Sequence, residues 1–221
     1  DDGTIRIRDV ATGRVAILLQ ADATGIRSLS FSPGGGGLAA AALDGSVRVW
    51  EVATGGLRYR LHAGQPDRLL AVAWSPDGSL LASPGATGDL VLVDARTGTP
   101  QRSLPARCEP TALAWSPDGA RLAAACYDRG VELWDVRSAS RLVVLAGHTD
   151  LVHAVAWSHD GTRLATAGFD HTVRVWDASS GRQRSSLGGH VGRVFGVDWS
   201  PDDRRIVSSG EDAALKLWDA A

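Results

Sequence analysis

Short apolar stretches alternate with turn-forming residues along the whole chain. Segments such as AVAWS (71–75), RLATAG (163–168) and TVRVWD (172–177) alternate or run apolar over five or six residues and are rich in β-branched side chains. No helical periodicity competes with them. SPDG lies between the first two strands of a unit, where Pro suits the first central position of a turn and Gly the left-handed position that follows. The pattern predicts an all-β chain of short strands joined by tight turns.

The predicted strands recur with a period of about 42 residues. One series reads FSPGG, WSPDG, WSPDG, WSHDG and WSPDD, and a second reads IRIRD, VRVWE, LVLVD, VELWD, VRVWD and LKLWD. All eight tryptophans fall in these two series. An outer strand follows in each unit except the last, as in RVAIL (14–18) and RLVVL (141–145). Four antiparallel strands at this interval, with Trp-Asp at the end of the third, are the signature of a β-propeller blade.

The sequence resembles the WD-repeat β-propeller family over essentially all of its 221 residues, since GH, the hairpin and WD recur together. The resemblance implies a ring of blades that acts as a rigid platform for other molecules, usually without catalysis. About five four-stranded blades and a partial blade are expected, as part of a larger, seven-bladed ring. The chain, 1–221, is predicted to be one propeller domain or propeller fragment, with blades at 1–20 (partial), 21–62, 63–105, 106–146, 147–188 and 189–221 (lacking its outer strand).

The predicted strands do not close a ring, because the third strands number six and the first strands only five. A missing sector would expose backbone donors and acceptors and part of the core. The chain also contains no Met. We therefore expect a segment of a longer chain with further blades or domains; the alternatives are an engineered fragment and copies that complete one another by self-association.

The pair Asp170 and His171 has the composition of a catalytic dyad, but its register indicates a structural role. Asp recurs six residues before the third-strand anchor in five of six units, whereas the next position varies. The resemblance implies that this Asp joins a hydrogen-bonded tetrad with a His, a Ser or Thr, and the third-strand Trp. Two complete tetrads are expected: His148, Thr166, Asp170 and Trp176, and then His190, Ser208, Asp212 and Trp218.

The earlier units depart from the tetrad pattern, and packing and turns alone are expected to hold them. The departures replace the His, the hydroxyl or the Trp. They are Asp22, Gln65 and Ala106 at the His, Ala40 and Ala124 at the hydroxyl, and Val93 and Arg8 at the Trp.

Binding is expected at residues that the repeat does not explain, above all the aromatic residues outside the repeat anchors. In the resembled family, the position before the turn Asp and those three and five residues after the His lie on the narrow top face of the propeller. Exposed aromatic rings beside Arg and Glu are typical of a protein or peptide interface. The alternative is that each ring packs only beside its own loop. The predicted partner-binding residues are Arg27, Arg68, Tyr127, Leu151, His153, Phe169, Arg193, Phe195 and Glu211.

Composition narrows the function classes. A formal net charge of −2 supplies no broad basic field for nucleic acid, and no apolar stretch is long enough for a membrane helix. No metal-binding or nucleophile motif occurs, so no cofactor, metal or catalytic residue is expected. The two cysteines, Cys108 and Cys126, are expected to be reduced and inert, as in a cytoplasmic protein.

The leading interpretation is a non-catalytic WD-repeat scaffold in the cytoplasm that binds a protein or peptide through the top face of the propeller. The alternative is a regulatory or ligand-sensing propeller module of a larger signalling protein, for example a bacterial kinase or a nucleotide-hydrolysing switch. A propeller hydrolase with a metal in its channel would need convergent carboxylates or histidines, and the repeat offers no such recurring set.

Overall fold

The computed structural model describes residues 3–21, 25–62, 71–85, 87–106, 109–128 and 130–220. In this part of the chain all regular structure is β, so no helix is available to cross a membrane. The all-β prediction is confirmed: consecutive strands pair into antiparallel sheets of two to four strands, as expected for propeller blades. The chain divides into two compact units, Asp1–Ser103 and Leu104–Ala221.

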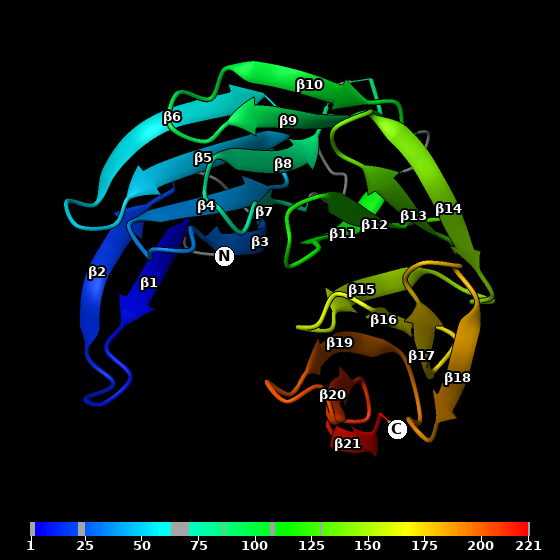
Figure 1. Cartoon of the computed structure of the whole chain (residues 1–221). Coiled ribbons are helices and arrows are strands. Elements are labelled where there is room, and N and C mark those ends of the chain that lie inside the picture. Colours follow the sequence, from blue (N-terminus) through cyan, green and yellow to red (C-terminus); the bar gives the residue numbers. More distant parts are fainter. Residues whose placement is uncertain are drawn as a thin grey trace. The chain divides into compact units, whose positions relative to one another are not determined.

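The first unit contains a two-stranded sheet, β1-β2, and two four-stranded sheets, β3 to β6 and β7 to β10 (Figure 1). The first ten strands are β1 (Thr4–Arg8), β2 (Val15–Gln20), β3 (Ile26–Phe31), β4 (Gly37–Ala42), β5 (Ser46–Glu51), β6 (Gly56–His62), β7 (Ala73–Trp74), β8 (Leu80–Pro84), β9 (Leu90–Asp94) and β10 (Pro100–Leu104).

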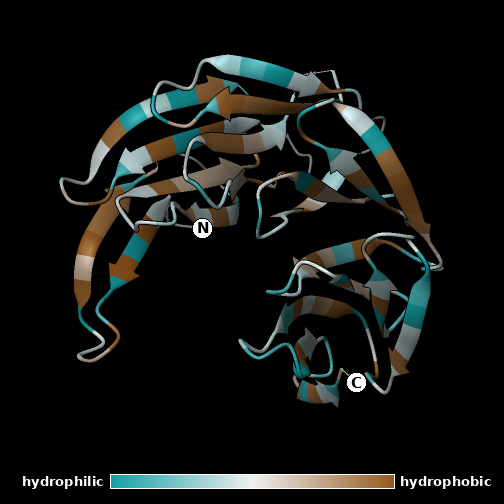
Figure 2. Cartoon of the chain, viewed as in Figure 1, coloured by the Kyte–Doolittle hydropathy of each residue, from teal (hydrophilic) through white to brown (hydrophobic). Residues whose placement is uncertain are grey.

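The second unit contains two four-stranded sheets, β11 to β14 and β15 to β18, and the three-stranded sheet β19-β20-β21. Hydrophobic residues follow the inner strands of each sheet, and hydrophilic residues mark many turns and outer strands (Figure 2). The remaining strands are β11 (Pro110–Trp115), β12 (Arg121–Cys126), β13 (Gly130–Asp135), β14 (Ser140–Ala146), β15 (Val152–Trp157), β16 (Arg163–Gly168), β17 (Thr172–Asp177), β18 (Gln183–Gly188), β19 (Val194–Trp199), β20 (Arg205–Gly210) and β21 (Leu215–Asp219).

The first-strand tryptophans join neighbouring sheets. In the second unit, the Trp157 indole N–H donates to the carbonyl of Ala114 at 3.0 Å, and the indole of Trp199 donates to Ala156 at 3.3 Å. Trp157 and Trp199 are buried among the small and branched side chains of two adjacent sheets. The repeated Trp is therefore explained by the contact between sheets, which buries a large ring and satisfies its one donor.

Tyr59 has a similar role in the first unit. Its hydroxyl donates to the carbonyl of Ala95 at 2.8 Å, and its ring packs on an apolar core to which β4, β5, β7, β8 and β9 contribute. Burial raises the pKa of Tyr59 to about 12. Tyr59 is thus a packing residue that connects two sheets.

One prediction about the cysteines is wrong. Cys126, the last residue of β12, is completely buried and its sulfur is in a disulfide bond rather than a free thiol. Cys108 lies outside the described residues. The spacing of two cysteines in a sequence does not reveal whether their sulfur atoms can meet.

Two residues that differ from the repeated hairpin-turn sequence, His159 and Asp203, bind each other across neighbouring blades. His159 stands where other units have Pro, and Asp203, with a positive φ of 57°, stands where they have Gly. The Asp203 carboxylate accepts the backbone N–H of His159 and of Asp160, both at 2.8 Å, and lies 3.0 Å from the His159 ring nitrogen. A Pro at position 159 has no N–H to donate.

In the preceding pair of blades, Pro117 and Gly161 stand at the positions equivalent to His159 and Asp203. Gly161 lies beside Pro117, so that a Cβ built on Gly161 would sit 3.6 Å from Pro117 Cδ. We expect His159→Pro and Asp203→Gly each to lower the free energy of unfolding by about 1 kcal/mol. The double variant restores a Pro and Gly pair and should lose less than the sum, by about 1 kcal/mol, in a urea-unfolding double-mutant cycle. Strictly additive losses would contradict the pairing.

Candidate functional site

The first expected tetrad, on β15 to β17, forms one continuous hydrogen-bonded chain. The His148 ring places Nδ1 2.9 Å from Oδ2 of Asp170 and Nε2 2.7 Å from the Thr166 hydroxyl. The Trp176 indole N–H donates to the same hydroxyl at 2.9 Å. His148, Thr166 and Trp176 are all buried.

The second tetrad, on β19 to β21, repeats this geometry. His190 lies 2.9 Å from Oδ1 of Asp212 through Nδ1 and 2.8 Å from the Ser208 hydroxyl through Nε2. The Trp218 indole donates to Ser208 at 2.8 Å. The backbone N–H of Val191 also donates to Asp212, at 3.0 Å.

The donors and acceptors of the first tetrad determine where its protons lie. A carboxylate only accepts, so His148 carries a proton on Nδ1 and donates it to Asp170. In neutral His148, Nε2 then accepts the hydroxyl proton of Thr166, whose oxygen accepts from Trp176. This direction leaves no member unpaired. The His148 ring joins a carboxylate and a hydroxyl as the ring of a catalytic triad does, but the Thr166 hydroxyl is completely buried and also accepts from Trp176, so it is not open to a substrate in this arrangement.

The carboxylates of the tetrads are held in the charged form. Burial acts to raise the pKa of Asp170, but hydrogen bonds from His148, the Thr149 N–H and Thr172 outweigh it and hold the pKa well below its usual value. For Asp212 the hydrogen bond from His190, and then the backbone N–H of Val191, lower the pKa to about 2.

Two blades that lack a complete tetrad use other ionic hydrogen bonds, so the prediction that packing and turns alone hold them is wrong. In β11 to β14, the buried Glu132 accepts the indole N–H of Trp134 at 3.1 Å and the guanidinium of Arg141 at 2.6 Å. Glu132 pairs across the strands with Ala124, the residue that replaces the hydroxyl. A carboxylate from the neighbouring strand thereby substitutes for the missing acceptor.

The sheet β3 to β6, whose unit has Asp22 and Ala40 at the tetrad His and hydroxyl positions, holds its turn Asp with arginine. Asp44 accepts from Arg48 at 2.8 Å and from Arg60 at 3.1 Å, and Arg48 is buried. Burial acts to raise the pKa of Asp44, but the hydrogen bonds from Arg48 and Ser46 outweigh it and lower the pKa to about 2.

The sequence signal for the first case was Glu132, an acidic residue two positions before the third-strand Trp, where the complete tetrads have Arg174 and Lys216. Arg48 holds the position of Arg174, which likewise binds its turn Asp, Asp170, at 3.3 Å.

Two of the aromatic residues outside the repeat, Phe169 and Phe195, gather with His153 and Arg193 in one group, which we call the Phe169 cluster. The ring of His153 is stacked on Phe169 with 5.6 Å between centroids, and Phe195 meets both rings edge to face at 5.4 and 5.8 Å. The Arg193 guanidinium lies 4.7 Å from the centroid of Phe169. The cluster joins β15 to β18 with β19 to β21 and has the geometries that aromatic and cation–π pairs favour.

One further bond orients the cluster. His153 Nδ1 donates to the carbonyl of Phe195 at 2.7 Å, which directs Nε2 away from that strand. Phe195 remains 39% exposed, and Arg193 is exposed beside it. The rings are therefore fixed by one another while part of their surface stays open to solvent.

Tyr127, Phe169 and Glu211 occupy the same place in three successive blades. Each directly follows the second strand of its sheet and donates its backbone N–H across the sheet, to the carbonyls of Glu109, Leu151 and Arg193. Tyr127 is 59% exposed and Glu211 is exposed, with its carboxylate accepting the Arg193 N–H at 3.2 Å. The same edge of three blades thus carries Tyr127, the Phe169 cluster and Glu211.

Three predicted binding residues remain. Leu151 is only 6% exposed, so its side chain lies in the core rather than on this surface. Its place beside the strand pairing buries the side chain while its carbonyl accepts from Phe169. Arg27 is exposed but belongs to the first unit, and Arg68 lies outside the described residues. Within the described ranges, no group of three or more His, Cys, Asp or Glu side chains could hold a metal ion.

Four-stranded sheets at this interval, with buried His, Ser or Thr, Asp and Trp tetrads, define a WD-repeat β-propeller protein. The comparison with known families agrees. The chain belongs to the WD-repeat β-propeller family: the family described as WDR19 first beta-propeller matches residues 70–221, more than half of the chain, and the family described as WD domain, G-beta repeat matches residues 14–51.

Similar curated proteins share parts of the chain. WD repeat and SOCS box-containing protein 1 of Takifugu rubripes is 36% identical over 93 residues, which cover 42% of this chain and 22% of that protein. The Homo sapiens protein of the same name is 34% identical over 88 residues, 39% of this chain and 21% of that protein. Ribosome biogenesis protein BOP1 of Mus musculus is 38% identical over 68 residues, 31% of this chain and 9% of that protein. The chain thus spans less than a quarter of these relatives.

Proposed function

We propose that the chain is a non-catalytic scaffold that binds a protein or peptide through Tyr127, the Phe169 cluster and Glu211. The observation that carries the proposal is the Phe169 cluster, in which exposed rings and an arginine are already fixed in place by mutual contacts. Membership of the WD-repeat family supports the same function. Rings held in this way lose little conformational entropy on binding, and aromatic and arginine side chains carry much of the affinity of protein interfaces.

The side chains of this surface suggest how a partner is held. Phe195 and Tyr127 offer ring area, while the guanidinium of Arg193 offers several donors in one plane. Glu211 adds an acceptor of opposite charge to the same edge. A peptide with an apolar or aromatic side chain flanked by polar groups fits this combination, since the rings desolvate the apolar part and the charges fix its orientation.

To test the proposal, peptides can be selected from a displayed random library on the intact chain. The affinity of the selected peptides is then measured for variants by titration calorimetry. We expect Phe195→Ala and Tyr127→Ala each to weaken binding more than about tenfold, because a buried aromatic anchor contributes about 2 kcal/mol or more.

Leu142→Ala is the matched control, because Leu142 is 51% exposed on β14, the outer strand of the same blade as Tyr127. This variant should bind the peptides as the wild-type chain does. Unchanged affinity in Phe195→Ala and Tyr127→Ala, together with a large fall in melting temperature, would assign these rings to packing and overturn the proposal.

A further inference from the structure

The ring of His153, on β15, is fixed by three contacts that also determine where its proton lies. It stacks on Phe169 at an interplanar angle of 15°, and Phe195 meets it edge to face at 77°. Its Nδ1 lies 2.7 Å from the backbone carbonyl of Phe195. A carbonyl only accepts, so Nδ1 carries a proton in both the neutral and the charged ring. A neutral imidazole has one such proton, and Nε2 of neutral His153 therefore presents a lone pair.

The lone pair of Nε2 is open to a partner. Within the described ranges no hydrogen bond joins Nε2 to another group, and no buried side-chain nitrogen or oxygen is left without one, so solvent reaches Nε2. The equivalent residues of the neighbouring blades differ. Thr111 donates its hydroxyl to the carbonyl of Val152 at 2.5 Å, and Phe195 has no polar side-chain atom. Among these three positions, His153 is the one that offers an unused ring nitrogen.

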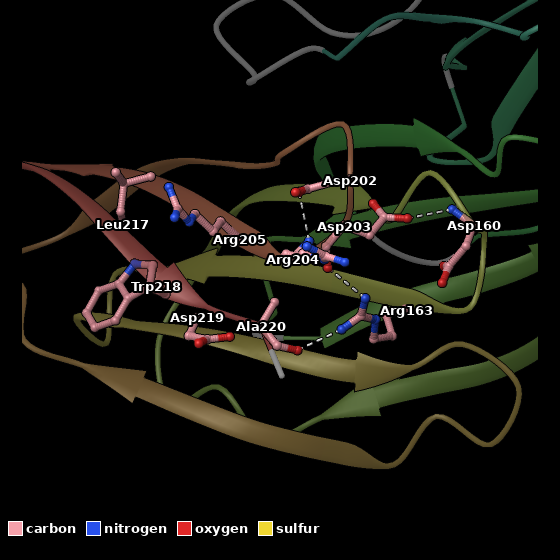
Figure 3. Close-up of a pocket in the computed structure, with 10 residues that line it drawn as sticks. All are labelled: Asp160, Arg163, Asp202, Asp203, Arg204, Arg205, Leu217, Trp218, Asp219 and Ala220. Carbon is pink, nitrogen blue, oxygen red and sulfur yellow. Dashed lines mark hydrogen bonds between the residues drawn. The ribbon is translucent and has the colours of Figure 1, made fainter.

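The guanidinium of Arg193 has unused donors beside this nitrogen. Arg163 shows how an arginine over a ring is otherwise satisfied. It lies 4.6 Å from the ring centroid of Trp199 and donates to the carbonyls of Ala220 and Asp203 at 2.7 and 2.8 Å (Figure 3). Arg193 lies at a similar distance, 4.7 Å, from its own ring, but in the described part of the chain no hydrogen bond occupies its guanidinium. Its N–H groups remain for a partner.

We propose that His153 selects the partner of the Phe169 cluster: the bound peptide donates a neutral hydrogen bond, from a hydroxyl or an N–H group, to Nε2 of His153. The inference rests on the proposed peptide binding by this surface. A cationic donor fits less well, because Arg193 places a positive charge in the same cluster. An acidic group finds donors on Arg193 but only a lone pair on neutral His153. The peptide thus brings a neutral donor to His153 and an acceptor, such as a backbone carbonyl, to Arg193.

Protonation of His153 reverses this pattern. Nδ1 already carries a proton, so the added proton goes to Nε2, which then donates and opposes the donor of the peptide. Histidine ordinarily changes its charge between pH 5 and 8, whereas Asp and Glu ordinarily stay charged above about pH 5. The peptide therefore binds best while His153 is neutral, and we expect its affinity to fall as the pH falls from 7.5 to 5.5.

Other charged groups lie at the same end of these blades. Glu211 accepts the Arg193 backbone N–H at 3.2 Å, and Asp150 accepts the Leu151 N–H at 2.8 Å. His171 is exposed in the turn after β16, and it is the other histidine at this end that ordinarily changes charge in the same pH range. The charged and titratable residues at this end are Glu109, Tyr127, Asp128, Asp150, Asp170, His171, Arg193 and Glu211.

The test uses histidine-free peptides selected on the intact chain whose affinity falls in Phe195→Ala. Titration calorimetry of the wild-type chain should give an affinity at least about fivefold lower at pH 5.5 than at pH 7.5, because one hydrogen bond is lost. His153→Phe keeps a ring on Phe169 but has no Nε2. It should bind about threefold or more weakly at pH 7.5 and respond little to pH. His171→Gly suits the positive φ of 67° at that position and is the matched control, which should keep the wild-type pH dependence.

A change in the peptide gives a second measurement that does not depend on the folding of a variant. Methylation of the hydroxyl and N–H groups of the peptide, one at a time, should find one donor whose loss weakens binding to the wild-type chain about threefold or more and removes the pH dependence. Two results would overturn the proposal: equal affinity at pH 7.5 and 5.5, and higher affinity at pH 5.5, which would make the peptide an acceptor at His153. Both results leave the Phe195→Ala effect intact, whereas selected peptides that all bind Phe195→Ala as they bind the wild-type chain would refute the proposed surface itself.

Discussion

Replacing Thr166 with Val is expected to lower the free energy of unfolding by about 2–4 kcal/mol, measured by urea denaturation. The change keeps the shape of the side chain but removes the hydroxyl that joins His148 to Trp176. A buried indole N–H and a buried ring nitrogen then lose their partners, at about 1–3 kcal/mol each.

Thr166→Ser is the matched control for this prediction. It keeps the hydroxyl, so both hydrogen bonds can form, and it removes only a methyl group from the core. We expect Thr166→Ser to retain most of the stability that Thr166→Val loses. Equal losses in the two variants would show that the methyl group, rather than the hydrogen-bonded chain, stabilises the blade.

Acid is expected to destabilise the second unit through its two tetrad carboxylates. The pKa values of Asp170 and Asp212 are lower in the folded chain than the value near 3.9 that an unfolded Asp has. The stability that these groups contribute is therefore fully present above about pH 4. It is lost as the pH falls through the folded pKa, which is about 2 for Asp212.

Urea unfolding at pH 7, 4, 3 and 2 measures this dependence. The variant Asp170→Asn with Asp212→Asn should be less stable than the wild-type chain at pH 7. It should also lose less stability between pH 4 and pH 2, because two of the groups that take up protons on unfolding are gone. An unchanged slope in the double variant would contradict the assignment of the acid sensitivity to the tetrads.

The position of a residue in the repeat was enough to predict whether Asp170 and His171 are structural or catalytic. Asp170 recurs at one position in most units while His171 does not, and this alone separated the structural carboxylate from the turn residue beside it. His171 has a positive φ of 67°, where Gly45 stands in an earlier unit. The repeated Asp meets a side-chain requirement that most units share. The next position requires only a left-handed backbone, which Gly3, Gly45, Gly88 and Ala213 also adopt, so its side chain varies.

Register along the repeat predicted less well the contacts of a blade in which one residue loses a hydrogen-bonding group and a second residue of the same blade supplies it. Ala124 removes the hydroxyl from its blade, and the acceptor returns as Glu132 on the neighbouring strand. A departure at one position and its replacement at another are linked only by their distance across the sheet. The pairing of His159 with Asp203, which are 44 residues apart, could not be predicted from the sequence for the same reason.

By itself, the sequence determined the all-β class and the 42-residue blade, because strand periodicity, turn residues and repeated anchors are local or periodic properties, and its resemblance to the WD-repeat family implied the members of the tetrads. Only the tertiary structure decided which unrepeated residues meet. It buried Leu151, and it gathered His153, Phe169, Arg193 and Phe195 into one cluster. Side-chain contacts between blades depend on distances between atoms far apart in the chain, and a spacing along the sequence does not encode those distances.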